Sequence, residues 1–212
     1  TSYEPAELSE KFSERLEQGH HMFKMKIGRR WDDDLRRMEA ARGVLGDAPK
    51  LFVDANGAYD PRHALEMAAA MAEFRVSWYE EPVSSDDLPG LRFVRDHVGP
   101  HVSIAAGEYG YSPDYFRRML DAKAVDVLQA DATRCMGISG FLKVHALCEA
   151  EYRPMSAHCA PALHLHVCLA LNQIRHIEYF RDHARLENIL FEGVTMPKDG
   201  RLVPDLNRKG MG

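Results

Sequence analysis

Eight residues of types that transfer protons or bind metals recur at regular intervals along this 212-residue chain: Lys24, Lys26, Asp54, Glu80, Glu108, Asp131, His158 and Glu178. From Lys26 onward they are 20 to 28 residues apart. This spacing is close to one strand-plus-helix unit of a (β/α)8 barrel, roughly 31 residues. Because such a barrel gathers the carboxyl ends of its strands at one mouth, the spacing predicts an enzyme active site.

Three of these residues are carboxylates at the ends of consecutive predicted strands: Asp54, Glu80 and Glu108. Converging carboxylates repel one another unless a hard cation lies between them, and an all-oxygen ligand set suits Mg²⁺. One acidic residue at a strand end is more often a helix cap. Three in step favour a magnesium site.

Lys24 and Lys26 are separated by one residue. Alternation along a strand places both side chains on the same side. Buried there, they would repel each other, and with a nearby metal this would lower the pKa of one towards that of a general base. An exposed edge strand with two solvated lysines is the alternative.

Asp131 and His158 end two neighbouring predicted strands. A carboxylate that accepts from one imidazole nitrogen fixes the tautomer and leaves the other nitrogen as base or acid. Glu178 ends the last strand and could reach a substrate from the far side.

The elements that must position these residues alternate between strand and helix. Short apolar segments predict strands at Met22–Ile27, Leu51–Asp54, Val76–Glu80, Val102–Ala105, Val125–Ala130, Met155–His158 and Ile177–Phe180. Helices are expected between them from caps, prolines and apolar periodicity at Pro5–Gln18, Trp31–Leu45 (with Asp32, Asp33 and Asp34 favouring its start), Pro61–Met71, Tyr115–Ala122, Ser139–Glu151 and Ala162–Leu171.

This alternation predicts an α/β fold with a parallel sheet, either a barrel or a doubly wound sheet. A polar residue at nearly every strand end favours the barrel, because a doubly wound sheet places its site at one switch point. Only seven strands are found, and the helix Pro5–Gln18 precedes the first. Thr1, Ser2 and Tyr3 are therefore interpreted as the tail of a strand, and the chain as a C-terminal portion of a longer one.

Composition gives weaker limits. A formal net charge of −5 offers no electrostatic reason to expect nucleic acid or an anionic membrane as a partner. Four cysteines without a CxxC pair indicate reduced thiols in a cytoplasmic protein. We also expect a homo-oligomer.

A second metal chemistry is possible at His164 and His166, which form a His-x-His near His158. Zinc there is disfavoured because residues two apart on a helix do not face together. A zinc hydrolase barrel and a non-catalytic barrel kept for binding remain the alternatives from other classes.

Together these motifs resemble the barrel domain of the enolase superfamily, specifically its mandelate racemase subgroup. The resemblance covers essentially the whole chain. It is carried by Lys24-Met25-Lys26-Ile27-Gly28, Val53-Asp54-Ala55-Asn56, Glu80-Glu81-Pro82, Gly107-Glu108, Asp131, Ser156-Ala157-His158 and Glu178.

The resemblance implies a modified TIM barrel, (β/α)7β, spanning residues 1–212. Most of its first strand and the α+β capping domain that normally precedes it would be absent from this chain. It implies Mg²⁺ on Asp54, Glu80 and Glu108, holding a small carboxylate substrate. It further implies proton transfer by Lys26 on one face and by His158, paired with Asp131, on the other. Lys24 would assist Lys26, Glu178 would hydrogen-bond an enediolate oxygen, and Asn56 would contact the substrate.

The implied reaction is abstraction of the α-proton of a hydroxy-carboxylate, most simply by an acid-sugar dehydratase (a hydro-lyase), with a racemase or epimerase as the alternative. Muconate-lactonising and dipeptide-epimerising relatives carry lysine where this chain has Asp131. Glucarate dehydratase relatives carry asparagine where it has Glu108. Arg134 and Met136 stand where relatives commonly carry lysine and glycine, so they are departures from the pattern.

Overall fold

The structure is a computed structural model that describes residues 3–211. It divides into two compact units: unit 1 ends at Ala105 and unit 2 begins at Ala106. The elements, in chain order, are α1 (Pro5–Glu17), β1 (Met22–Lys26), α2 (Trp31–Leu45), β2 (Lys50–Asp54), α3 (Pro61–Ala70), η1 (Met71–Phe74), β3 (Val76–Glu80), α4 (Leu88–His97), β4 (Ser103–Ala106), α5 (Pro113–Asp121), β5 (Val127–Ala130), α6 (Gly137–Ala150), β6 (Met155–Ala157), α7 (Pro161–Leu169), β7 (Ile174–Ile177) and α8 (Arg181–Leu190).

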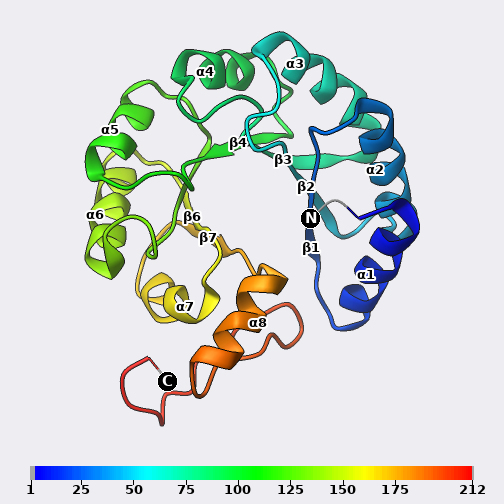
Figure 1. The fold of residues 1–212 in the computed structure, drawn as a ribbon. Helices are drawn as coiled ribbons and strands as arrows, with labels where there is room; N and C mark the ends of the chain where they lie inside the picture. The colour runs from blue at the N-terminus through cyan, green and yellow to red at the C-terminus, as the bar shows by residue number, and fades with distance from the viewer. Residues whose placement is uncertain (1–2, 212) are drawn as a thin grey trace. The chain divides into compact units, whose positions relative to one another are not determined.

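Unit 1 is built on β1 to β4, which pair in chain order and run parallel. Their register places Lys26 opposite Asp54, Asp54 opposite Glu80, and Glu80 opposite Ala105. In Figure 1, α1 to α4 lie on one side of these strands. Leu51 and Val53 of β2 are fully buried, as expected for strands covered on both faces.

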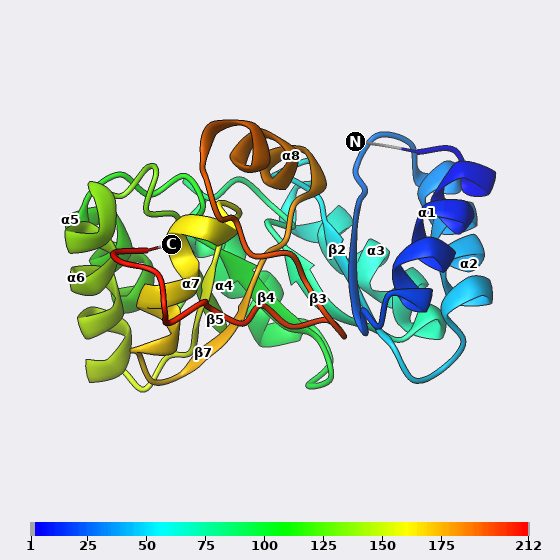
Figure 2. The same ribbon diagram turned by 90° about the horizontal axis from the view of Figure 1, so that it is seen from below.

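Unit 2 contains β5, β6 and β7, which also pair in chain order and run parallel. Its helices α5 and α6 pack against each other. Figure 2 shows the segment after α8, in red, running past α7. The alternating helices and parallel strands confirm the predicted α/β fold class.

The helix boundaries follow the expected local chemistry. The Asp60 side chain accepts hydrogen bonds from the backbone amides of Arg62 and His63 at the start of α3, and Pro61 occupies the first helical position. Gly46 ends α2 with a φ of 63°, a conformation that a residue without a Cβ adopts at little cost.

The predicted last strand, Ile177–Phe180, is wrong by three residues: β7 runs Ile174–Ile177. Met155 of β6 pairs with Ile174 and Ala157 pairs with Ile177, so the strand begins three residues earlier than predicted. Glu178 therefore follows the strand directly instead of lying within it.

Smaller differences concern the other elements. β5 begins at Val127 rather than Val125, and β6 ends one residue before His158. Helices α4 and α8 have no counterpart among the predictions. Thr1 and Ser2, part of the predicted strand tail, lie outside the described residues.

The four cysteines are buried free thiols. Within the described residues, no helix combines the length and the apolar character needed to cross a bilayer.

Candidate active site

Each predicted site residue lies in a strand or at its carboxyl end. Lys24 and Lys26 are in β1, Asp54 ends β2 and Glu80 ends β3. Glu108 follows β4 by two residues. The next residue after β5, β6 and β7 is Asp131, His158 and Glu178, respectively. Because strands within each unit are parallel, unit 1 and unit 2 each gather their own share of these side chains at one edge.

In unit 1, two lysines are paired with two fully buried carboxylates. Lys24 Nζ donates to Glu80 Oε1 and Oε2, both at 2.7 Å, and lies 3.8 Å from Asp54 Oδ2. Lys26 Nζ donates to Asp54 Oδ2. The side chains of Lys24 and Lys26 are 17% and 29% exposed, whereas those of Asp54 and Glu80 are 0% exposed. The predicted shared side of the strand is thus confirmed, and two solvated edge lysines are excluded.

The lowered lysine pKa is expected beside a metal ion, and the contacts of Lys26 with the protein alone act in the opposite direction. Burial acts to lower its pKa, but the charge of Asp54 and the hydrogen bond to it outweigh burial, so the pKa lies above its ordinary value. The repulsion from Lys24 is a smaller effect than the attraction of Asp54. In unit 1 alone, Lys26 is therefore held as an ammonium.

Two features of unit 1 escaped the sequence analysis. Trp78 donates from Nε1 to Glu80 Oε2 at 2.9 Å. It lies two positions before Glu80 and so on the same side of β3, which is the signal that could have revealed it. Trp78 also stacks on Phe52, with ring centroids 5.5 Å apart.

The second is a buried ion pair beneath the end of β1. Arg37 donates to Asp34 Oδ1 at 2.9 Å and to the carbonyl oxygen of Lys26 at 2.8 Å, while the amide of Gly28 donates to Asp34 Oδ2 at 2.7 Å. Asp34 was interpreted as a residue that favours the start of α2. The structure adds that it fixes the strand end that carries Lys26.

Asn56 is exposed and adopts a φ of 45° just after β2. Its backbone amide donates to Asp54 Oδ1 at 2.9 Å. In the structure, Asn56 therefore holds one oxygen of Asp54 through its main-chain amide.

In unit 2, one imidazole is surrounded by three carboxylates. His158 Nδ1 lies 2.8 Å from Asp131 Oδ2, as predicted for the pair. On the opposite side of the ring, Nε2 lies 3.1 Å from Glu108 Oε2 and 3.6 Å from Glu178 Oε2. The backbone amide and hydroxyl of Thr133 donate to Asp131 Oδ1 at 2.8 and 2.7 Å.

These contacts decide the charge of His158. Burial acts to lower its pKa, but the hydrogen bonds to Asp131, Cys159 and Glu108 and the charge of Glu178 raise the pKa well above the ordinary value. Burial acts to raise the pKa of Asp131, yet its hydrogen bonds with His158 and Thr133 bring it below its usual value. These contacts therefore favour an imidazolium paired with a carboxylate, a form that carries a proton to donate.

Glu108 depends on the glycine before it. Gly107 has a φ of 133°, and a Cβ there would lie 2.2 Å from the carbonyl oxygen of Gln129 in β5. Arg134 donates to the backbone carbonyl of Glu108 at 3.0 Å and lies over the ring of Tyr109, 5.4 Å from its centroid. Arg134 thus positions the Glu108 loop, a contact that the sequence analysis did not foresee.

The contacts of His164 argue against the zinc alternative at His164 and His166. His164 is fully buried, and both of its ring nitrogens are engaged: Nδ1 donates to the Cys159 carbonyl at 2.8 Å and Nε2 accepts from the Ala132 amide at 2.9 Å. Burial lowers the pKa of His164. This neutral ring joins the loop after Asp131 to the loop after His158, so it is a positioning residue.

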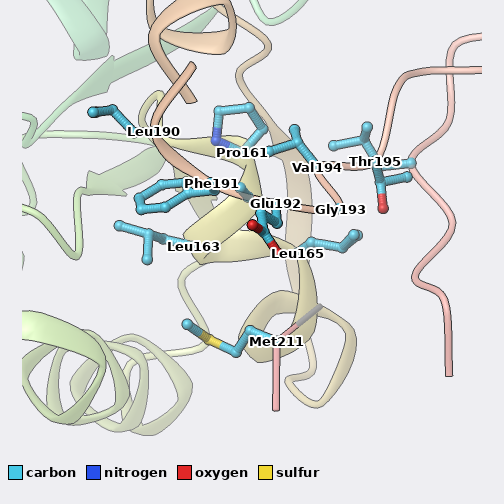
Figure 3. A pocket seen from close by; sticks show the side chains of 12 residues that line it. Pro161, Leu163, Leu165, Leu190, Phe191, Glu192, Gly193, Val194, Thr195 and Met211 are labelled. Atoms are coloured by element: carbon cyan, nitrogen blue, oxygen red, sulfur yellow. The ribbon is translucent and has the colours of Figure 1, made fainter. Parts of the chain in front are cut away.

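A separate cavity of about 280 Å³ lies between α7 and the C-terminal segment of unit 2. Figure 3 shows its mainly apolar lining, which includes Pro161, Leu165, Phe191, Val194 and Met211. None of the eight predicted site residues lines this cavity. The cavity is therefore distinct from the clusters of site residues at the strand ends of each unit.

Comparison with known proteins gives the same assignment as the site residues. The solved structure of a mandelate racemase/muconate lactonizing enzyme-like protein from Rubrobacter xylanophilus superposes with a TM-score of 0.95 and 45% identity, over 100% of this chain and 59% of that one. L-talarate dehydratase from a Polaromonas species, solved with Mg and L-glucarate, gives a TM-score of 0.86 and 30% identity, over 94% and 54%.

The L-talarate/galactarate dehydratase of Salmonella typhimurium is 33% identical over 88% of this chain and 46% of its own length. The chain spans about half the length of the curated relatives it matches. The model of the family described as enolase C-terminal domain-like matches residues 7–212. The chain therefore belongs to this family, which confirms its resemblance to the enolase superfamily.

Proposed function

We propose that the protein abstracts the α-proton of a hydroxy-carboxylate and then expels the 3-hydroxyl, as an acid-sugar (aldonate or aldarate) dehydratase. The observation that carries the proposal is His158, held as an imidazolium by Asp131, Glu108 and Glu178. A group that must protonate a leaving hydroxyl is effective only while it carries its proton. The names of the dehydratase relatives agree with this chemistry.

Asp54 and Glu80 of unit 1 and Glu108 of unit 2 are the proposed Mg²⁺ ligands. All three are buried carboxylates, 4% exposed or less. Asp54 ends β2, Glu80 ends β3, and Glu108 follows β4 by two residues. Oxygen ligands of this kind fit Mg²⁺ rather than a softer metal. When bound, Mg²⁺ would supply Lewis-acid stabilisation to an enediolate and offset the negative charge that holds the proton on Lys26.

Lys26 is the proposed base for the α-proton. It requires the neutral amine for that step, and its pairing with Asp54 works against that form. Its reactivity therefore depends on how far Asp54 is neutralised. Lys24, paired with Glu80, would remain an ammonium that donates to the substrate carboxylate.

Glu178 and Asn56 are proposed substrate contacts. Glu178 Oε2 already accepts from the Cys159 amide at 3.3 Å, which fixes its position beside His158. Protonated, its carboxyl group could donate to an enediolate oxygen. The exposed Asn56 side chain lies beyond β2, beside the proposed metal ligand Asp54.

His158 then delivers its Nε2 proton to the departing 3-hydroxyl, and Asp131 retains the hydrogen bond at Nδ1. A substrate without a hydroxyl at C3 cannot lose water. With such a substrate the same two groups, Lys26 and His158, would exchange the α-proton between faces, which is the racemase or epimerase alternative.

The experiment is incubation of the full-length protein with Mg²⁺ and a panel of aldonic and aldaric acids in D2O, followed by proton NMR. We expect one acid to lose its α-proton signal and give a 2-keto-3-deoxy product. Exchange with epimer formation alone would assign the racemase reaction. No exchange by Mg²⁺-loaded protein on the whole panel would reject the proposal.

The metal assignment has its own test. Glu108→Gln keeps the size of the side chain but removes its charge, so Mg²⁺ affinity measured by calorimetry should fall at least roughly tenfold. Glu149→Gln, an exposed position on α6, is the matched control and should bind Mg²⁺ normally. Full affinity in Glu108→Gln would remove Glu108 from the ligand set.

A further inference from the structure

We propose that His158, Cys159 and Glu178 form a second cation site, selective for thiophilic divalent ions such as Zn²⁺ and Cd²⁺. Its ligands are one imidazole nitrogen, one sulfur and one carboxylate oxygen. It differs in chemistry from the all-oxygen set proposed for Mg²⁺, and it also differs from the His-x-His pair in α7.

The distances between the three ligand atoms fit one tetrahedral ion. His158 Nε2 and Cys159 Sγ are 3.2 Å apart, Cys159 Sγ and Glu178 Oε2 are 3.4 Å apart, and His158 Nε2 and Glu178 Oε2 are 3.6 Å apart. Zinc bonds of the usual lengths to sulfur, nitrogen and oxygen place such atoms roughly 3.3 to 3.6 Å apart in a tetrahedron. Small adjustments of the side chains would therefore suffice to hold the ion.

The backbone explains how two consecutive residues can face one ion. In a strand, neighbouring side chains point to opposite sides, but β6 ends at Ala157, and Cys159 and Ala160 adopt φ values of 49° and 41°. Left-handed conformations of this kind are costly for residues with a Cβ and persist where surrounding contacts enforce them. Here this turn brings the Cys159 thiol back to the His158 ring.

The contact that enforces the turn is His164. Its Nδ1 donates to the Cys159 carbonyl, and its Nε2 accepts from the Ala132 amide. The ligand geometry is thereby held by α7 and by the loop after β5, without any ion. A site held in place in this way loses little conformational entropy on binding.

The chemistry of the donors selects the ion. Sulfur and imidazole ligands favour Zn²⁺ and Cd²⁺ over Mg²⁺. Asp131 accepts from Nδ1 of the same ring, an arrangement in which a carboxylate orients the metal-binding nitrogen. The Glu178 side chain is 15% exposed, which gives the cluster a side open to solvent.

Binding is a simple exchange of protons for metal. Bonds form from the ion to Nε2, Sγ and Oε2, and the Nε2 proton and the thiol proton leave to solvent. If the proposed function is correct, an ion on Nε2 occupies the atom that protonates the leaving hydroxyl, and Zn²⁺ would inhibit the enzyme. That consequence rests on the proposed function, whereas binding itself does not.

The test is a Cd²⁺ titration of the full-length, Mg²⁺-loaded protein, monitored by the near-ultraviolet charge-transfer absorption of a cadmium–thiolate bond. We expect one Cd²⁺ per chain with this band in the wild type. Cys159→Ser should lose the band, and Glu178→Gln should bind Cd²⁺ at least tenfold more weakly. Cys168→Ser removes another buried thiol of the same unit and should behave as wild type.

An undiminished band in Cys159→Ser, or wild-type affinity in Glu178→Gln, would overturn the proposal. Loss of the band in Cys168→Ser but not in Cys159→Ser would place the thiol ligand elsewhere and overturn it too. Near-ultraviolet circular dichroism confirms that each variant is folded. Failure of the proposed reaction would appear separately, as no α-proton exchange with Mg²⁺ alone.

Discussion

Both units bury ionisable groups at strand ends, but they pair cations with carboxylates in different ways. Unit 1 pairs two lysines with two carboxylates, each cation against its own anion. Unit 2 places one imidazole among three carboxylates, Asp131, Glu108 and Glu178. The first arrangement is balanced, and the second has an excess of negative charge around one proton.

This difference separates the proposed tasks. In unit 1, the base must lose a proton that Asp54 helps to hold, so its chemistry depends on neutralising that carboxylate. In unit 2, the excess negative charge keeps the proton on His158, so the acid is ready without any change. Variants in each unit should therefore fail in different steps.

The largest effect is expected for Lys26→Ala, which removes the base of unit 1. Both α-proton exchange and product formation should fall by about 10² to 10⁴, the usual contribution of a positioned base. Proton NMR in D2O measures both on one sample. Lys50→Ala, at an exposed position at the start of β2, is the control. Unchanged exchange in Lys26→Ala would remove it from its role.

His158→Asn removes the proposed acid of unit 2 and should separate α-proton exchange from elimination. Product formation should fall by about 10² to 10⁴, while exchange at the face served by Lys26 continues, because that unit is intact. The ratio of exchange to elimination, measured by NMR, is the readout, and His166→Asn in α7 is the control. Equal loss of exchange and elimination would indicate a structural role for His158.

Asp131→Asn should shift the pH profile without removing the acid. Asp131 is one of the groups that raise the pKa of His158. Without its charge the pKa falls, and His158 loses its proton at lower pH. The alkaline limb of the kcat profile should therefore move down by about one unit or more. Asp121→Asn, exposed on α5, should leave the limb in place, and an unmoved limb in Asp131→Asn would contradict the assigned acid.

The smallest effect is expected for Trp78→Phe in unit 1. The change removes the hydrogen bond to Glu80 and keeps most of the stacking on Phe52. Loss of one such bond to a buried carboxylate costs about 1.5 to 3 kcal/mol of unfolding free energy. Urea denaturation measures it, and a variant as stable as wild type would show that the bond contributes nothing net.

Sequence alone went furthest where a residue's position is fixed by simple periodicity. Lys24 and Lys26 share one side of β1 because strand side chains alternate, and Asp54 and Glu80 end their strands where the apolar segments stop. It failed at β7, where pairing with β6 shifted the strand by three residues.

The pKa of Lys26 depends on a contact that the sequence does not reveal. Repulsion between Lys24 and Lys26 can be inferred from their spacing. The opposing attraction comes from Asp54, which lies 28 positions after Lys26 in the chain and accepts a hydrogen bond from it. Which effect is larger depends on distances that no local pattern contains.

By itself, the sequence determined the α/β class, the order of the strands and the residue types at their carboxyl ends. Those properties follow from local periodicity and turn chemistry. Only the tertiary structure decided that carboxylates contact Lys26 and His158 and favour their protonated forms, that Trp78 supports Glu80, and that His164 joins the two loops of unit 2. These depend on contacts between residues distant in the chain, where burial and charge compete over a few ångströms.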